Sequence, residues 1–596
     1  MINVIADNIL SPLGDTTEQN YQAVVSGRSA LCRYTNRWSL PEPFVASLFS
    51  LEQEHAFMRE GMTRFEAMVM KSVGSALAQT DIDVTSADVV LVISTTKGNI
   101  DELSLSPSSS IPSSSSSEKR VSPSASAQHV ATALGMTTTP IVVCNACISG
   151  VSALSLASRL LQQKTYRYAI VCGADSQNRF IVSGFQSLKA MSDEPCRPFD
   201  EERLGLNLGE AAATVILSSN DSITMSGVKG ETAEATSAES CSGWHIVSSA
   251  VRNDAFHLSN PSRTGEGSRL AIESVVKGVE KGDLAVINAH GTATMYNDQM
   301  ESVAIERAGL GAIPVNALKG IYGHTMGAAG VLETILTMHS LDQSVVLGTP
   351  GYAERGVSGR INIQKTSEMA QGTTFLKIIS GFGGCNGAIL LSKTSCGEQD
   401  VSTAQVTATM TELRTTHTVS ITPNAVVLDG ETIEVEGTGK AMLTSLYKSY
   451  VADYPKFYKM DVLSRLGFIA TELLLRREGI ERFLEREDRG VVLFNSHSSI
   501  TADKEYLASI SNDEEYFPSP SAFIYTLPNI VTGEIAIRNK YHGETAFYVL
   551  PQRDEETMSN IISATFADTA MSSLIVGWVD CESDDEFEAS VSIVER

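Results

Sequence analysis

Residues 1–395 alternate short apolar runs with alanine-rich stretches of helical periodicity, and this alternation constrains the fold more than any other feature. Arg64–Ala78 and Gly150–Gln163 place apolar side chains at helical spacing. β-Branched runs between such stretches, bounded by glycine turns, predict short buried strands. These runs are Val89–Ser94, Ile141–Cys144, Tyr168–Cys172, Ala212–Leu217, Leu284–Asn288 and Phe375–Ile379. The pattern indicates an α/β protein whose sheets are covered by helices.

Two polar segments interrupt this pattern. Ser104–Ala127 is a Ser/Pro tract that contains the run Ser113–Ser117, and such a composition predicts a surface loop. Residues 396–418 lose apolar periodicity and are rich in Thr, Ser and Glu, which predicts a linker. The chain is therefore expected to hold a first domain at 1–395, a linker at 396–418 and a second domain at 419–596.

The second domain repeats the order of segments found in the first half of the first domain. The sequences of the predicted strands are similar: DVVLVIS matches RGVVLFN, and AIVCGAD matches LIVGWVD. Internal similarity of this kind predicts a partial duplication. The later motifs of the first domain have no counterpart before Arg596, so we expect an incomplete α/β repeat. The repeated segments are Leu463–Arg476, Gly490–Asn495, Tyr525–Tyr548 and Ser573–Asp580.

Composition excludes several classes of protein. A net charge of −25 argues against a nucleic-acid partner, which requires clustered Lys and Arg. No stretch approaches the ~20 consecutive apolar residues of a membrane span, and the N-terminus does not resemble a signal peptide. Nine cysteines without CxxC pairs or metal-ligand spacing fit a reducing compartment. We expect a cytoplasmic protein without a bound metal.

Cys147 stands at a predicted strand-to-helix junction, in the sequence VVCNACISG. A helical run starts near Ser149, so the sulfur is expected at the positive end of a helix dipole, which favours the thiolate. This signal is weak alone, because buried free cysteines are common, and Cys144 is expected only to pack in the strand.

Two histidines also follow apolar or glycine-rich segments. His290 lies before a Gly-Thr turn, at the end of the apolar strand in VINAHGTATMYNDQMES. His324 lies on a Gly-rich loop in NALKGIYGHTMGAAGVLET. The segment ISGFGGCNGAILL joins two strands through glycines that let backbone N–H groups approach a ligand. A cysteine with two histidines supplies a nucleophile and two neutral donors or bases. Charged residues accompany both motifs, namely Asp298, Glu301, Lys319 and Glu333.

Together these motifs resemble the thiolase superfamily and, within it, the elongating β-ketoacyl-acyl-carrier-protein synthases. They are NACISG around Cys147, CRPFDEERLGLNLGEAA from residue 196, AHGTATMYND at 289–298, LKGIYGHTMGAAG at 318–330 and GFGGCNG at 381–387. They occur in the family's order and span nearly all of 1–395. The resemblance implies a thiolase-like α-β-α-β-α layered fold, as a homodimer or as a heterodimer with an inactive sister chain.

The resemblance also implies roles for individual residues. Cys147 would carry the acyl group, and His290 and His324 would donate hydrogen bonds to the enolate oxygen formed on decarboxylation. Lys319 and Glu333 match a supporting ion pair. Asp298 and Glu301 match supporting acids behind the His290 turn. The N–H groups of Cys147 and Phe382 match an oxyanion hole, and Phe382, followed by Gly383, matches a gating aromatic.

The implied reaction is a decarboxylative Claisen condensation of an acyl thioester with a malonyl-acyl-carrier protein, in fatty-acid or polyketide/polyene biosynthesis. No cofactor is implied, because loss of CO₂ supplies the carbanion and both acyl groups travel on the phosphopantetheine of the carrier. That carrier is acidic, so a basic patch is expected here. Its candidates are Lys119, Arg120, Arg197 and Arg203.

Two residues differ from the family's motifs, and two alternative functions remain open. Leu204 stands where the family has Asp, and Cys385 where GFGGTN has Thr. One alternative is a thiolase-like coenzyme A enzyme of the Cys-His-Asn type, which lacks one of the two histidines. The other is a non-catalytic chain-length-type partner subunit, which loses the nucleophile. In the second domain the Cys147 position falls near Asp554 or Glu555, so that domain is expected to lack a nucleophile. It is either a packing or docking module that covers the dimer face of the first domain, or a loosely attached evolutionary remnant.

Overall fold

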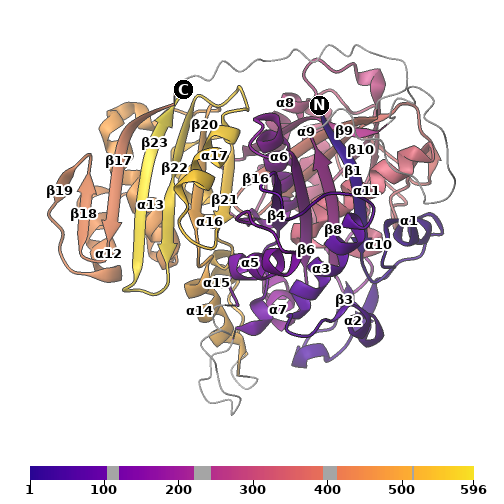
Figure 1. Ribbon diagram of the computed structural model, residues 1–596, viewed down its shortest axis with the longest axis horizontal. Coiled ribbons are helices and arrows are strands. Elements are labelled where there is room, and N and C mark those ends of the chain that lie inside the picture. Colours follow the sequence, from indigo (N-terminus) through magenta and orange to yellow (C-terminus); the bar gives the residue numbers. More distant parts are fainter. Residues whose placement is uncertain (104–119, 220–242, 394–412, 513–515) are drawn as a thin grey trace.

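The computed structural model describes residues 1–103, 120–219, 243–393, 413–512 and 516–596. Residues 1–393 form a layered α/β domain, and residues 413–596 form a smaller one beside it (Figure 1). The expected linker at 396–418 lies mostly outside the described residues, as do residues 104–119 of the Ser/Pro tract. Within the described residues, no helix combines the length and apolar composition needed to cross a bilayer.

The first sheet of the larger domain has five strands in the order β5-β4-β6-β8-β1. β4 runs parallel to β5 and to β6, whereas β8 is antiparallel to both β6 and β1. Their bounds are β1 Ile2–Leu10, β4 Val89–Ser94, β5 Ile141–Val143, β6 Tyr168–Asp175 and β8 Ala211–Ser218. The predicted strands in this region are therefore confirmed.

A second sheet, in the order β9-β16-β15-β10-β11-β13, follows in the chain. Two helices, α6 (Ser149–Gln162) and α11 (Ala329–Asp342), pack on each other and contact strands of both sheets. Nearly every residue of both helices is buried, as expected for a layer covered on two sides. The strand bounds are β9 Trp244–Asn253, β10 Leu284–Asn288, β11 Pro314–Asn316, β13 Asn362–Ile363, β15 Thr374–Gly381 and β16 Cys385–Lys393.

Outer helices complete the layers. α3 (Arg64–Leu77) lies on the first sheet against β1, β6 and β8, and α8 (Glu266–Val275) lies on the second sheet against β9 and β16. The result is the α-β-α-β-α arrangement that the resemblance implied. Further helices are α1 Thr17–Val25, α2 Leu51–Phe57, α5 Pro123–Leu134, α7 Arg179–Ser187, α9 Met295–Arg307 and α10 Lys319–Tyr322.

The smaller domain repeats the first sheet strand for strand. The repeated part has the order β21-β20-β22-β23-β17, with β20 parallel to β21 and β22, and with β23 antiparallel to β22 and β17. Two short antiparallel strands, β18 (Ala425–Leu428) and β19 (Glu431–Ile433), continue the sheet beyond β17. α13 (Val462–Leu475) covers this sheet as α3 covers the first. The incomplete repeat of the N-terminal half is thus present in the fold. The strand bounds are β17 Arg414–Thr422, β20 Arg489–Asn495, β21 Thr545–Val549, β22 Ser573–Cys581 and β23 Phe587–Glu595.

Within residues 413–512 and 516–596, this smaller domain has no second sheet, and the pattern of its strand β23 reflects that. β23 alternates buried apolar residues such as Ala589 and Val591 with the exposed Glu588 and the half-buried Ser590. Its counterpart β8 is buried along its whole length because α3 and α11 cover both faces. Alternation of this kind is typical of a sheet with one face in water.

The two domains share one continuous sheet. β21 pairs antiparallel with β5, with Tyr548 opposite Val143 and Val549 opposite Val142. α17 (Glu555–Thr565) packs on α6 across the same boundary. Ion pairs also join the two domains, among them Arg159–Glu544 at 2.8 Å and Arg252–Asp568 at 2.6 Å.

Two predicted boundaries differ from the structure. α5 begins at Pro123, inside the tract predicted as a loop, because proline is favoured in the first turn of a helix. β17 begins at Arg414, inside the predicted linker. Its threonines resemble linker residues, but they are exposed or half-buried β-branched residues of a strand whose sheet has one face in water.

Candidate active site

Cys147 lies in the short 3₁₀ turn Ala146–Ile148 between β5 and α6. Ala146 has a φ of 49°, a left-handed conformation that a residue with a side chain rarely adopts. The Ser149 hydroxyl ties this turn, since it accepts the N–H of Asn145 at 2.8 Å and donates to the Ala146 carbonyl at 2.6 Å. The turn therefore holds Cys147 at the start of the buried helix α6.

His290 and His324 approach Cys147 from separate segments. His290 follows β10, and His324 lies in the loop after α10. The two imidazole rings are 4.9 Å apart between centroids and nearly perpendicular. One side-chain atom from each of the three residues, the cysteine sulfur and a ring nitrogen of each histidine, lies within 4.8 Å of the others. The structure thus brings together the three residues predicted from the sequence.

The backbone fixes the proton position of His324. Its Nδ1 accepts the N–H of Met326 at 3.2 Å, so the proton of the neutral ring resides on Nε2. That Nε2 is buried and has no hydrogen-bond partner among the described residues. A buried donor without a partner is costly, and it indicates a ligand oxygen at this place.

Burial sets the charge state of all three groups. It raises the pKa of the Cys147 thiol to about 12, although Lys319 opposes this shift. Burial also lowers the pKa of His290 and of His324 well below 6.5. The expectation that the helix terminus favours the thiolate is therefore outweighed by desolvation, and the site rests as a neutral thiol between two neutral imidazoles.

A buried ion network stands behind the histidines. Lys319 Nζ lies 2.8 Å from Glu333, and Lys377 Nζ contacts the other oxygen of the same carboxylate. Burial alone would raise the pKa of Glu333, but the two lysines outweigh it and lower that pKa. Lys377 was not predicted from the sequence. The available signal was a single lysine inside the apolar strand TFLKIISG, opposite Asn288 of β10.

Asp298 and Glu301, both on α9, hold backbone in place. The Glu301 carboxylate accepts the N–H groups of His290 at 2.7 Å and Gly291 at 2.8 Å. Asp298 accepts the N–H of Phe199 at 2.7 Å. Both acids lie behind the reacting groups, and Glu301 determines the path of the turn that carries His290.

Phe382 and Gly383 lie in the tight turn between β15 and β16. Backbone N–H groups of Cys147 and Phe382 interact with the Cys147 sulfur and partly offset the burial that raises its pKa. Gly383 cannot add a third donor, because its N–H donates to the Leu258 carbonyl at 2.6 Å. Its φ of +89° explains why glycine is required there.

A cavity beside Cys147 is lined by both domains. The smaller domain contributes Phe523, Thr526 and Leu527. Phe523 lies against Phe185, with ring centroids 5.5 Å apart. The larger domain contributes Thr96, Lys97, Ala146, Ile181, Phe185, Met326 and Phe382. The internal repeat predicted a second domain, but no motif in the sequence predicted that residues 523–527 would line this cavity.

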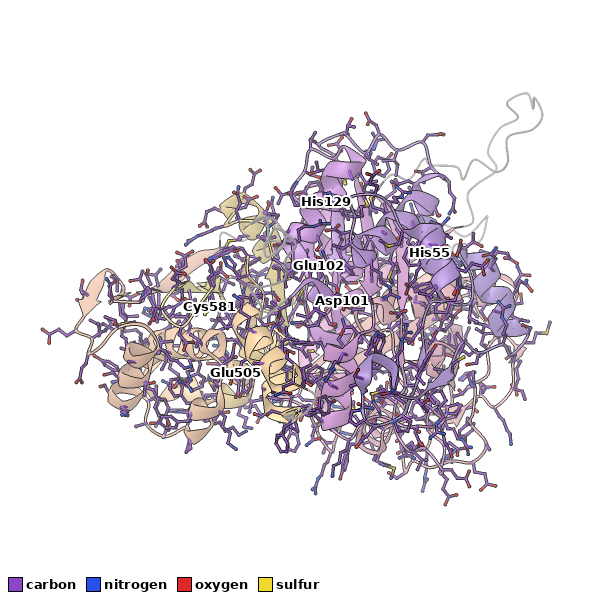
Figure 2. The ribbon with its side chains drawn as sticks, turned by 90° about the horizontal axis from the view of Figure 1, so that it is seen from below. His55, Asp101, Glu102, His129, Glu505 and Cys581 are labelled. Carbon is purple, nitrogen blue, oxygen red and sulfur yellow. The ribbon has the colours of Figure 1, made fainter. Side chains whose placement is uncertain are left out.

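The smaller domain has no second nucleophile at the matching turn. Residues 550–554, between β21 and α17, read LPQRD, and Asp554 caps α17 by accepting the N–H groups of Glu556 and Thr557. Cys581 lies at the end of β22 inside the smaller domain, away from the larger one (Figure 2). The described part of the smaller domain therefore has no equivalent of Cys147.

The predicted basic patch does not form from its candidates. Lys119 lies outside the described residues. The other three guanidinium groups each pair with an acid of this chain, and Arg203 is almost fully buried. These pairs are Arg120–Glu66, Arg197–Glu202 and Arg203–Asp298.

Comparison with known proteins agrees with this geometry. Two family models match, "Beta-ketoacyl synthase, N-terminal domain" over residues 1–222 and "Beta-ketoacyl synthase, C-terminal domain" over residues 244–353. The 3-oxoacyl-[acyl-carrier-protein] synthase 2 of Vibrio cholerae is 24% identical over 414 residues, which are 65% of this chain and 97% of the relative.

Two further comparisons concern a polyketide synthase subunit and a solved structure that also covers the smaller domain. The tetracenomycin polyketide synthase ketoacyl synthase alpha subunit of Streptomyces glaucescens is 30% identical over 271 residues, 42% of this chain and 59% of the relative. A solved structure described as PfaC Keto synthase-Chain length factor matches with a TM-score of 0.77 at 14% identity. That match covers 100% of this chain and 78% of the other, so the likeness in fold includes the smaller domain.

Proposed function

The chain belongs to the β-ketoacyl synthase family, and we propose that Cys147, His290 and His324 carry out its reaction, a decarboxylative Claisen condensation of an acyl thioester with a malonyl thioester. The observation that carries the proposal is the convergence of the three side chains, with one atom of each within 4.8 Å of the others. Cysteine and histidine are also zinc ligands, but here an unpartnered Nε2–H faces inward as a donor, which supports an oxygen ligand.

In the first half-reaction the Cys147 sulfur attacks the carbonyl carbon of the incoming acyl thioester. The thiol proton passes to a neutral histidine, and the developing oxyanion accepts the N–H groups of Cys147 and Phe382. The carbon–sulfur bond to the carrier then breaks, and the carrier thiol leaves with the proton. The acyl group remains on Cys147.

In the second half-reaction a malonyl thioester loses CO₂. The electrons of the broken carbon–carbon bond move to the thioester oxygen as an enolate, and the histidine N–H groups stabilise that charge. The enolate carbon attacks the acyl carbon on Cys147. The cysteine sulfur leaves and recovers a proton, and a 3-oxoacyl thioester is released. The residues need no cofactor for this, because decarboxylation supplies the carbanion.

We propose an acyl carrier protein as the thioester donor, and the name of the Vibrio relative supports this. We also propose that residues 413–596 act as a built-in partner subunit that covers the β5 edge, in place of a separate dimer partner. The β5–β21 pairing and the absence of a cysteine at residues 550–554 support that role. A free thiol nucleophile supports a reducing compartment, the cytoplasm.

The test is acyl labelling of the full chain. Incubation with an octanoyl thioester of a pantetheine mimic is expected to add one acyl group by intact-mass spectrometry. Cys147→Ala should abolish both the adduct and condensation. Cys385→Ser, a neighbouring thiol in the same site, serves as the control that keeps the adduct. An acyl group that persists in Cys147→Ala would refute Cys147 as the nucleophile.

A further inference from the structure

The turn that carries Phe382 is held by hydrogen bonds on nearly every backbone group. The Gly383 N–H donates to the Leu258 carbonyl at 2.6 Å. The Gly383 carbonyl accepts the Asn253 amide at 2.9 Å. The Gly383 N–H shares its peptide unit with the Phe382 carbonyl, so this unit is held on its N–H side, and its orientation is fixed on both sides when the carbonyl is held as well.

Two donors hold that carbonyl, one from each domain. The Phe382 oxygen accepts the side-chain amide of Asn529 at 2.9 Å and the thiol of Cys385 at 3.2 Å. Asn529 belongs to the smaller domain and is 1% exposed. Since a carbonyl oxygen has two lone pairs, its capacity to accept hydrogen bonds is filled. The opposite side of the turn carries the Phe382 N–H that interacts with the Cys147 sulfur.

The position of Asn529 in its own helix indicates that this contact is specific. Asn529 is the N-cap of α16 (Ile530–Asn539), where an asparagine side chain ordinarily accepts a backbone N–H of the first turn. Here the side chain makes no cap bond, and its amide is directed across the domain boundary instead. Gly533 of the same helix lets the turn come close, because a Cβ there would lie 2.7 Å from the Gly383 oxygen.

We propose that Asn529 is a positioning residue for acyl transfer: from the smaller domain it holds the carbonyl of Phe382, which fixes the backbone of that residue and so directs its N–H, in the adjoining peptide unit, toward the oxyanion formed at Cys147. This inference rests on the proposed function of Cys147. It gives the smaller domain a part wherever an oxyanion forms on the acyl carbon at Cys147, in acylation and in the final attack of the enolate. It gives that domain no part in decarboxylation, because the histidines that stabilise the enolate belong to the larger domain.

The test compares Asn529→Ala with Asn539→Ala in the full chain. Asn539 is equally buried on the same helix, but its amide bonds only to Ile535 within that helix. Two rates are measured, acylation of Cys147 by an octanoyl pantetheine-mimic thioester and CO₂ release from the malonyl thioester of the same mimic. Asn529→Ala should slow acylation at least about tenfold, since loss of one oxyanion donor costs on the order of 10²–10³ and a displaced donor retains part of its effect. CO₂ release should stay within about twofold, and Asn539→Ala should change neither rate by more.

A second pair of variants keeps the inference testable if Asn529→Ala does not fold. Cys385→Ala removes the other donor to the Phe382 carbonyl and should slow acylation selectively, whereas Cys385→Ser retains a donor and should not. Equal loss of acylation and of CO₂ release, equal loss in Asn539→Ala, or unchanged acylation in Asn529→Ala would overturn the inference while the proposed function stands. A wild-type chain that is never acylated on Cys147 would overturn both.

Discussion

At the scale of single residues, burial determines how the site can work. The thiol pKa near 12 and the low pKa values of both histidines mean that the resting site carries no charge on its three central groups. The thiolate of Cys147 therefore forms only as the thiol proton moves to a neighbouring imidazole. Neutral imidazoles are also the form that can donate a single directed N–H to an enolate oxygen.

This charge state predicts the pH dependence of decarboxylation. Because His290 and His324 are protonated only well below pH 6.5, CO₂ release should be constant from pH 6.5 to about 7, above which Lys377, with a pKa of about 8, begins to lose its proton. His324→Ala should lower CO₂ release on the order of 10²–10³ while Cys147 is still acylated. A sigmoidal fall in CO₂ release from a malonyl thioester as the pH rises through about 6.5 would show that a protonated imidazole is the active form, and it would contradict neutral donors.

The sequence predicted the residues that touch the reacting groups better than those that support them. Cys147, His290 and His324 each sit in a motif with its own glycine-rich or strand-end context. Lys377 and Asn529 lack such a context, because each acts through a contact formed only by tertiary packing. Asn529 in particular lies 147 residues from Phe382 in the chain, in a different domain.

At the scale of elements, α14 (Ile500–Ile510) ties the smaller domain to the wall of the cavity. Its Asp503 pairs with Lys97 of the larger domain at 2.5 Å, and both side chains are 5% exposed. Lys97 also donates to the Thr526 carbonyl at 2.6 Å. The pair is buried at the domain boundary, so its contribution to the free energy of unfolding depends on both charges being present.

Removing one charge should therefore cost more than removing both. Lys97→Met leaves Asp503 buried without its cation and should lower the free energy of unfolding by about 3–5 kcal/mol, while Lys97→Met with Asp503→Leu should recover most of that loss. Burial already raises the pKa of Asp503 to about 6, above its unfolded value, so the deficit of Lys97→Met should shrink as pH falls through that range. Chemical denaturation at pH 5 and pH 8 checks this, and a double variant as unstable as the single one would refute it.

Strands covered on both faces were predicted from their apolar runs, whereas the start of β17 was not. The strands from Val89, Tyr168 and Leu284 are continuous apolar runs because helices lie on both sides. Residues 414–418 of β17 fall within the predicted linker, because the threonines there are exposed or half-buried in a sheet that has one face in water.

At the scale of the whole molecule, two domains form one catalytic unit. One sheet runs through β5 and β21, and the cavity beside Cys147 has walls from both domains. The larger domain supplies the nucleophile and both histidines, whereas the smaller domain supplies no nucleophile among its described residues but closes the cavity. This arrangement supports our proposal that the smaller domain covers the β5 edge in place of a separate partner subunit.

A single-turnover experiment on the unmodified chain tests the central claim most directly. The chain is first charged with an octanoyl group on Cys147, freed of excess thioester, and then mixed with a malonyl thioester. Loss of the adduct, CO₂ release and formation of the 3-oxoacyl thioester should occur at the same rate and in equal amounts. Discharge of the adduct as free octanoic acid, without a carbon–carbon bond formed, would contradict the account.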